Sequence, residues 1–308
     1  MAFLLAHLSD PHIGPLPKIP FGEMLNKRLV GALNWHGTRA TIHDMDVLDL
    51  IIADLQAQNP DHIALTGDLV NIGHDAEFAQ AQTRLAPLGD AARLSIIPGN
   101  HDAYIPGALE NMAARFSPFL QGDAAEETAL PNFPTLRIRQ GIALIGVNSG
   151  APSLPFSARG KLGAGQIARL GAMLQKTREA GLFRVVMIHH PPLPRLARFA
   201  RGLVDGRAME ALLQREGAEL VIHGHNHRHA FVQLESRHGI VPILGVASAS
   251  AVPGTPRHRA EYHLIRIEPG AKAPLMLERR GMKDDNETIV FLEKIALGAD
   301  GLLTQPGS

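Results

Sequence analysis

Short apolar runs recur along the first three quarters of the chain, and most are separated by segments with helical periodicity. Five of these runs are rich in Leu, Ile and Val, which is typical of buried β-strands. They read FLLAHL, HIALT, RLSII, RVVMI and ELVI. Between residues 41 and 58, apolar residues return at helical spacing until Pro60 ends the pattern. The alternation of strand and helix predicts an α/β fold.

Four further segments have the spacing of amphipathic helices: residues 75 to 88, 107 to 116, 163 to 180 and 206 to 216. Two strands are expected at 135 to 139 and 142 to 147, and only Gln140 and Gly141 separate them. A two-residue connection that ends in Gly favours a tight β-hairpin.

The last third of the chain reads differently, because three strand-like runs, HAFVQLE, IVPIL and YHLIRIE, follow one another. We expect one domain over residues 1–280 and a C-terminal extension over 281–308. Within that extension, TIVFLEKIAL is interpreted as a docked helix and the final residues as a loose tail.

Composition and charge narrow the range of functions. The 308 residues are 45% hydrophobic, as in an ordinary globular protein, and 30 basic residues balance 30 acidic ones. Global charge therefore gives no reason to expect nucleic-acid binding. The absence of cysteine excludes disulfides and thiolate metal ligands. No secretory signal and no apolar run of the ~20 residues needed to span a bilayer are recognised, so the expected location is the cytoplasm, with peripheral attachment to the inner membrane face as an alternative.

Polar residues with metal-binding chemistry follow each of the five apolar runs. In chain order they are Asp10, His12, Asp68, Asn100, His101, His189, His225 and His227. The carboxyl ends of parallel strands meet at one edge of a sheet, where open α/β folds bind their ligands. Aspartate and histidine suit divalent transition metals, and one carboxylate can bridge two ions. The pattern predicts a two-metal site.

The motifs SDPH, TGD, PGNHD, a His two residues before Pro191, and HGHNH resemble those of the calcineurin-like metallophosphoesterases. The resemblance covers residues 10 to 227 and implies a four-layer αββα sandwich, to which we add a small helical cap. It also implies two sets of ligands that share one carboxylate. The first metal would be held by Asp10, His12, Asp68 and His227, and the second by Asp68, Asn100, His189 and His225.

The implied activity is hydrolysis of a phosphodiester. Two ions about 3.5–4 Å apart can hold a shared hydroxide that attacks phosphorus in line with the leaving alcohol. His101 is the expected general acid, and Asp102, with His190, is expected to orient the ligands or His101. The mixed oxygen and nitrogen donors permit Mn, Fe, Zn or Co.

Two unusual segments, residues 15–40 and 193–207, follow metal-ligand loops and are expected to form a cap over the site. The first contains Trp35 and the second Arg195, Arg198 and Arg201, which would line one side of a short basic amphipathic helix. We assign these four residues to substrate binding. They favour a phospholipid or lipid-linked substrate, as for phospholipase C-like enzymes, beside an anionic membrane.

Several alternatives stay open. The substrate could be cyclic AMP, a 2′,3′-cyclic nucleotide or UDP-2,3-diacylglucosamine, and the cap could be a structural lid or a contact between identical subunits. A catalytically silent binding module is disfavoured because no expected ligand is missing. A nuclease is disfavoured by the neutral net charge and by the lack of an aromatic-lined basic groove.

Overall fold

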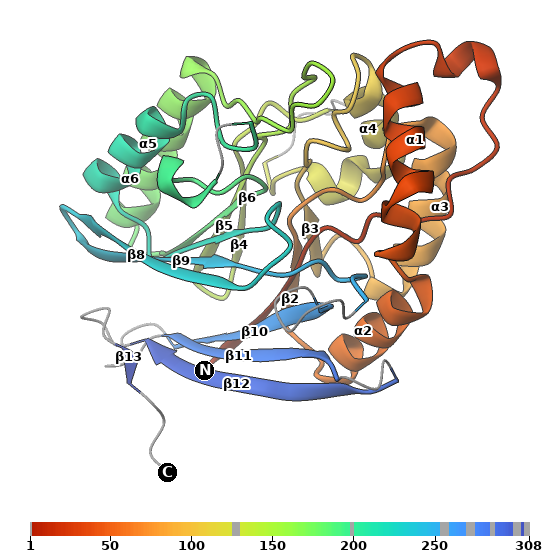
Figure 1. Ribbon diagram of the computed structural model, residues 1–308. Helices are drawn as coiled ribbons and strands as arrows, with labels where there is room; N and C mark the ends of the chain where they lie inside the picture. The colour runs from red at the N-terminus through yellow and green to blue at the C-terminus, as the bar shows by residue number, and fades with distance from the viewer. Residues whose placement is uncertain are drawn as a thin grey trace.

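Two mixed β-sheets lie face to face in the computed structural model, with helices on their outer faces (Figure 1). The structure describes residues 2–124, 130–197, 200–252, 259–268, 275–283, 287–297 and 303–304. The first sheet has the strand order β13-β12-β11-β10-β1-β2-β3 and the second β4-β5-β6-β7-β9-β8.

Strands of the first sheet come from both ends of the chain. They are β1 (Phe3–Leu8), β2 (His62–Leu65), β3 (Leu94–Ile96), β10 (Glu261–Ile267), β11 (Leu275–Met282), β12 (Ile289–Leu297) and β13 (Leu303–Thr304). The second sheet contains β4 (Thr135–Arg139), β5 (Ile142–Val147), β6 (Phe183–Ile188), β7 (Leu220–His223), β8 (Ala230–Ser236) and β9 (Gly239–Gly245).

The helices belong to three groups. The first sheet is covered by α2 (Met45–Ala57), α3 (Asp75–Leu85) and α4 (Ala108–Leu120), and the second by α5 (Ala164–Glu179) and α6 (Gly206–Glu216). Helix α1 (Lys27–Gly37) lies beside α4, outside these layers (Figure 1). Short 3-10 turns occupy Phe21–Met24, Arg39–Thr41, Ala86–Leu88 and Pro194–Leu196.

Three apolar layers hold the sandwich together. Leu5, Leu144 and Ile265 belong to the layer between the sheets. A second layer packs α2, α3 and α4 on the first sheet, and a third packs α5 and α6 on the second. A sheet that is covered on both faces requires continuous rather than alternating apolar strands, as the sequence has them. The expected four-layer αββα sandwich is confirmed.

Parallel pairing brings the chemistry-bearing loops to one edge. Strands β1, β2 and β3 run parallel, and so do β5, β6 and β7. The carboxyl ends of each set therefore meet, and the loops that follow them carry the polar motifs. The hairpin between β4 and β5 also forms as expected, with positive φ at Gln140 (49°) and Gly141 (82°), as its tight turn requires.

The C-terminal expectations need correction. The segment interpreted as a docked helix is strand β12, which pairs antiparallel with β11. The open edge of β11 offers unpaired backbone N–H and C=O groups, and a strand satisfies them where a helix cannot. The proposed boundary at residue 280 falls inside β11, so the first sheet continues through it.

The second half of the expected cap is also different. In the described part of residues 193–207, a short 3-10 turn, Pro194–Leu196, and the start of α6 at Gly206 stand in place of a basic amphipathic helix, and Arg198 lies outside the described residues. The backbone of this segment bonds to residues 158–160: Ala158 N donates to Ala200 O (3.0 Å), and Val204 N donates to Gly160 O (2.9 Å). In a helix Val204 N would donate to Ala200 O, but here both groups bond to residues 158–160, so no helical turn joins them.

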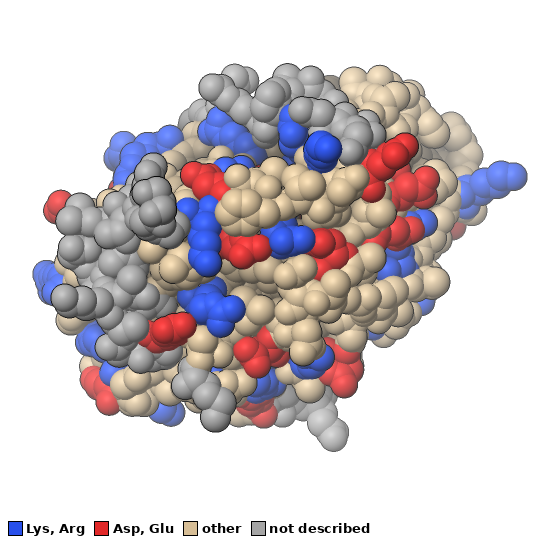
Figure 2. Space-filling view, turned by 90° about the horizontal axis from the view of Figure 1, so that it is seen from below, with Lys and Arg blue, Asp and Glu red and all other residues tan. Residues whose placement is uncertain are grey.

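Acidic and basic side chains alternate on the face shown in Figure 2. Strand β11 of the first sheet contributes two such pairs: Arg280 with Asp54 (2.8 Å) and Arg279 with Glu293 (2.7 Å). The described part of this face therefore carries no continuous basic patch. Among the described residues, no helix combines the length and apolar character needed to cross a membrane.

Candidate metal centre

Two groups of donor atoms meet at the carboxyl edge of the sheets. In the first group, His227 Nε2 lies 3.2 Å from Asp10 Oδ1 and 3.2 Å from His12 Nε2. His12 Nε2 is 3.7 Å from Asp68 Oδ2. Asp68 thus adjoins this first group, and it also belongs to the second.

The second group is centred on His189. Its Nε2 atom lies 3.2 Å from Asp68 Oδ2, 3.3 Å from Asn100 Oδ1 and 3.3 Å from His225 Nδ1. Ligands bound at about 2.0–2.2 Å in tetrahedral geometry stand about 3.3 Å apart, so these separations fit donors around one ion. The expected ligands are brought together in two sets, and each set could hold a metal.

Burial adjusts these side chains for metal binding. Asp10, His12, Asp68, His189 and His225 are almost completely inaccessible to solvent. Burial holds the pKa of His12 and of His225 well below its usual value, so both rings are neutral, the form that binds metal. Burial also acts on His189, but the carboxylates of Asp68 and Asp10 outweigh it and raise the pKa of His189 to about 9. The same carboxylates favour a metal cation at that position.

The backbone at the site is strained. Five of the expected ligands have left-handed φ angles: Asp10 (53°), His12 (40°), Asp68 (55°), His225 (66°) and His227 (52°). Such a conformation costs a non-glycine residue about 1–3 kcal/mol and persists only where the surrounding structure enforces it. Residues with strained backbone conformations are common at functional sites.

Asp102 and two glycines enforce this geometry. The buried carboxylate of Asp102 accepts hydrogen bonds from Asp68 N (2.8 Å), Leu69 N (2.9 Å) and Gly99 N (2.8 Å). A Cβ atom on Gly99 would stand 2.2 Å from Asp68 Oδ1, and one on Gly224 only 2.3 Å from Asp10 Oδ2. Asp102 was expected to orient the ligands or His101, and its bonds to the backbone of Asp68 and Gly99 are those of a positioning residue.

His101 and His190 occupy different environments. His101 Nδ1 lies 2.5 Å from Asn71 O and must donate to it, because a carbonyl oxygen only accepts. Its other nitrogen stays free for substrate. Both nitrogens of His190 are engaged, Nδ1 with Ser149 Oγ (2.8 Å) and Nε2 with Ala158 O (3.2 Å). The geometry therefore brings His189, and not His190, into the cluster.

Two residues near the centre were missed in the sequence. His43 precedes α2, and its ring centroid lies 4.6 Å from that of His12 while its Nδ1 contacts Ser250 Oγ (2.8 Å). Arg39 lies in a 3-10 turn, with Nη1 3.2 Å from His101 Nδ1. Neither residue follows an apolar strand, so no local signal in the sequence marked them as site residues. Their position becomes evident only when the chain folds onto the carboxyl edge of the sheets.

A cavity of about 560 Å³ opens beside Asn100 and His101. Three cations line it: Lys27 and Arg39 from the first cap segment and Arg201 from the second. Tyr104, Val30, Leu33 and Phe156 supply its apolar surface. Arg201 also donates to His225 O (3.1 Å), which ties the second cap segment to the metal-ligand loop.

Two of the expected substrate-binding residues lie elsewhere. Trp35 is only 3% exposed, and its ring stacks on that of His43 at an interplanar angle of 9°. It therefore anchors α1 to the core and presents no surface to a lipid. Arg195 is paired with Glu210 (2.8 Å) and does not line the cavity.

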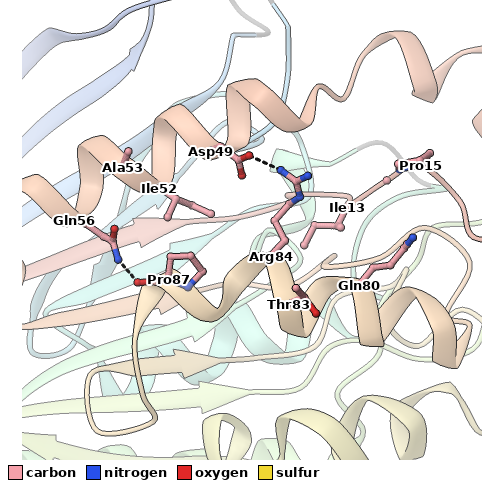
Figure 3. Close-up of a pocket in the computed structure, with 11 residues that line it drawn as sticks. Ile13, Pro15, Asp49, Ile52, Ala53, Gln56, Gln80, Thr83, Arg84 and Pro87 are labelled. Carbon is pink, nitrogen blue, oxygen red and sulfur yellow. Dashed lines mark hydrogen bonds and ion pairs between the residues drawn. The ribbon is translucent and has the colours of Figure 1, made fainter.

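A larger groove of about 680 Å³ lies between α2 and α3, away from the expected ligands (Figure 3). Three of its polar side chains are engaged with neighbours: Arg84 pairs with Asp49 (2.6 Å), and Gln56 donates to the backbone of Pro87. The smaller cavity, which adjoins His101, is therefore the candidate substrate site.

The family model for calcineurin-like phosphoesterases matches residues 3–229 of the chain. The chain belongs to this family. Its members bind a binuclear metal centre, and this calcineurin-like phosphoesterase is accordingly a metal-dependent phosphoester hydrolase. The resemblance that the sequence motifs indicated is confirmed.

Relatives of this phosphoesterase are phosphodiesterases by name. A probable cyclic nucleotide phosphodiesterase of Synechococcus is 29% identical over 71% of this chain and 76% of its own. A glycerophosphodiester phosphodiesterase of Enterobacter lignolyticus is 27% identical over 75% and 73%. A dimetal phosphatase from Danio rerio shares the fold with a TM-score of 0.62, covering 96% of this chain and 99% of its own at 13% identity.

Proposed function

We propose that this phosphoesterase is a two-metal phosphodiesterase whose ligands are those that the sequence predicts. One ion would be held by Asp10, His12, Asp68 and His227, and the other by Asp68, Asn100, His189 and His225. The donor separations and the burial of these side chains support this assignment. Divalent cations at these positions supply charge stabilisation and an activated water for hydrolysis.

The chain's own residues would bind and orient the diester. Arg39 and Arg201 reach the cavity from opposite cap segments, so they can donate to the non-bridging phosphate oxygens. His101 Nδ1 donates to Asn71 O, so its other nitrogen carries a proton only in the imidazolium form; in that form it can donate the proton to the leaving-group oxygen or stabilise its charge.

The substrate we propose is a small water-soluble phosphodiester, with a cyclic nucleotide as the leading candidate. The observation that carries this proposal is the cavity that joins His101 to three cations within about 560 Å³, a volume suited to a small ligand. The ring of Tyr104, which stacks on His101, and the apolar wall beside it could accept a base. The two relatives named above support a soluble diester rather than a phospholipid.

A lipid-linked diester is the second candidate, because apolar side chains surround the cavity. Leu33 is 66% exposed and Phe156 is 90% exposed, and both side chains line the cavity. Exposed apolar surface of this kind can contact acyl chains or a partner.

Metal-reconstituted protein should be assayed with cyclic AMP, 2′,3′-cyclic AMP, a glycerophosphodiester, phosphatidylglycerol vesicles and UDP-2,3-diacylglucosamine. We expect the highest kcat/KM with a cyclic nucleotide, and Asp68→Asn should abolish the activity. If a glycerophosphodiester were the best substrate, the proposal of a soluble diester would stand, but the cyclic nucleotide would no longer be the leading candidate. Turnover of the vesicles or of the diacylglucosamine substrate alone would establish the lipid candidate in its place.

A further inference from the structure

A second cluster of histidines lies between the two sheets, apart from the binuclear centre. His229 immediately precedes β8 of the second sheet, whereas Glu261 and His263 are on β10 of the first. His7 on β1 is opposite His263 in the strand register, and their rings meet edge-on. None of these residues belongs to the proposed ligands of the two catalytic metals.

Three atoms of this cluster form a compact triangle of donors. His263 Nε2 lies 2.9 Å from Glu261 Oε1 and 3.3 Å from His229 Nδ1, and His229 Nδ1 is 3.7 Å from Glu261 Oε1. Donors bound to one tetrahedral ion at about 2.0–2.1 Å stand about 3.3 Å apart, which lies within the range of these separations. The separations in the binuclear centre are similar, at 3.2 to 3.7 Å.

The surroundings supply the second layer that a metal site needs. Arg279 donates to both carboxylate oxygens of Glu261 (2.8 and 2.7 Å), which fixes the orientation of that carboxylate. Arg279 is in turn paired with Glu293 (2.7 Å). Two carboxylates against one guanidinium leave one net negative charge, so a cation is electrostatically compatible with the cluster. Carboxylates that bind metals are commonly held in this way.

The hydrogen bonding of the buried rings shows which nitrogen of His263 could bind an ion. Among the described residues, His263 Nδ1, His7 Nδ1 and His223 Nε2 are buried without a hydrogen-bond partner. The His263 side chain is fully buried, and its only polar contacts are through Nε2, which faces the other two donors. His263 would therefore bind a cation through Nε2, the nitrogen that lies beside the other two donors.

We propose that His229, Glu261 and His263 form a third metal site, separate from the two catalytic ions. A His₂Glu set with one open position suits a first-row divalent cation such as Zn²⁺. Such an ion links the second sheet, through the residue just before β8, to β10 of the first sheet.

Metal counting tests the proposal. Chelator-stripped protein is titrated with Zn²⁺, separated from free metal and analysed for metal per chain. The full-length wild type should bind three equivalents and His229→Ala two, with turnover of bis(p-nitrophenyl) phosphate retained. His238→Ala is the matched control, because His238 bonds to Arg178 (2.8 Å) and lies outside the cluster, and it should bind three.

A second comparison separates this site from the catalytic one. Asp68→Asn should lose catalytic metal but keep one equivalent, and the double variant Asp68→Asn/His229→Ala should lose that equivalent as well. Two equivalents in both the wild type and His229→Ala would overturn the proposal and leave the cluster as a structural ion network. That result would not affect the proposed hydrolytic function.

Discussion

At the residue scale, the site depends on side chains that are buried, strained and mutually dependent. Asp68 is the clearest case: its Oδ2 approaches His12 and His189 in both halves of the site, while its Oδ1 accepts from His101 N (2.7 Å). A single carboxylate thus links both proposed ions to the residue proposed as general acid. Substituting it affects metal content and chemistry together.

We expect Asp68→Asn to lose metal and activity with the fold retained. Changes in residues that merely support a ligand cost about 10–100-fold in metal affinity or activity, so loss of the shared ligand should cost at least about 100-fold. Metal analysis and kcat/KM on bis(p-nitrophenyl) phosphate measure both effects. Asp46→Asn, an exposed carboxylate in the first turn of α2, is the control and should match the wild type. Full metal content in Asp68→Asn would contradict the bridging assignment.

His101→Ala should separate binding from chemistry. The variant keeps every proposed ligand, so its metal content should be unchanged, while kcat falls by about 10²–10⁴-fold because the leaving group lacks its proton donor. The loss should be smaller with a substrate whose leaving group is a good one, such as p-nitrophenolate. An equal loss on good and poor leaving groups would show that His101 does not act as an acid.

At the scale of elements, loops after parallel strands supply the ligands and the cap supplies the cations. Arg39 and Arg201 come from segments that are 162 positions apart in the sequence, yet both line one cavity. Arg201 holds the loop of His225, and Arg39 lies against His101. Both cap segments therefore contribute side chains to the cavity proposed as the substrate site.

Replacing Arg39 or Arg201 with Gln should weaken substrate binding. A hydrogen bond from a charged donor is worth about 1.5–3 kcal/mol, so KM should rise by roughly tenfold or more in each variant. Arg195→Gln is the matched control, because Arg195 is paired with Glu210 outside the cavity, and its KM should not change. Equal effects from all three substitutions would indicate general electrostatics instead of specific contacts.

Trp35→Ala should act through packing. Removing a buried aromatic side chain costs about 3–5 kcal/mol, and here it also removes the surface on which His43 stacks. The free energy of unfolding, or the local hydrogen-exchange protection of α1, should fall accordingly. Leu33→Ala in the same helix removes an exposed side chain and should change stability little. Unchanged protection in Trp35→Ala would show that the ring does not anchor the cap.

At the scale of the whole molecule, buried histidines outside the site make the fold sensitive to acid. His62 on β2 is fully buried and its Nε2 contacts Ser95 Oγ (2.8 Å). Burial, with Arg137 and Arg139 nearby, lowers its pKa to about 3. In the unfolded chain the ring takes up a proton near pH 6.5, but in the folded chain it does so only near pH 3. Between these values protonation favours the unfolded state.

The free energy of unfolding should therefore decrease as the pH falls below about 6.5, by up to ~1.4 kcal/mol per pH unit for this one group. Urea titrations of chelator-treated protein between about pH 5 and pH 7 measure it. His62→Gln cannot titrate, so its stability should fall less steeply over the same range, whatever its absolute value. Parallel curves for the two proteins would exclude His62 as a source of the acid sensitivity.

The sequence by itself determined the fold class, the family and the order of the metal-binding motifs. Strand periodicity and the positions of Asp10, Asp68 and His189 just after apolar runs are local properties, and parallel strands bring their ends together without further information. Local pattern also predicted the Gln140-Gly141 hairpin, because a two-residue turn needs positive φ at both positions.

Features that depend on contacts between residues far apart in the sequence were decided only by the tertiary structure. β12 is a strand because the edge of β11 needs a partner, and Trp35 is buried because His43 and Gly14 lie beneath it. Arg201 was predicted from the sequence, but the places of Lys27 and Arg39 in the cavity were recognisable only once both cap segments were in place. The left-handed φ angles of the ligands have the same origin, since strain is sustained by surrounding contacts that no local stretch of sequence contains.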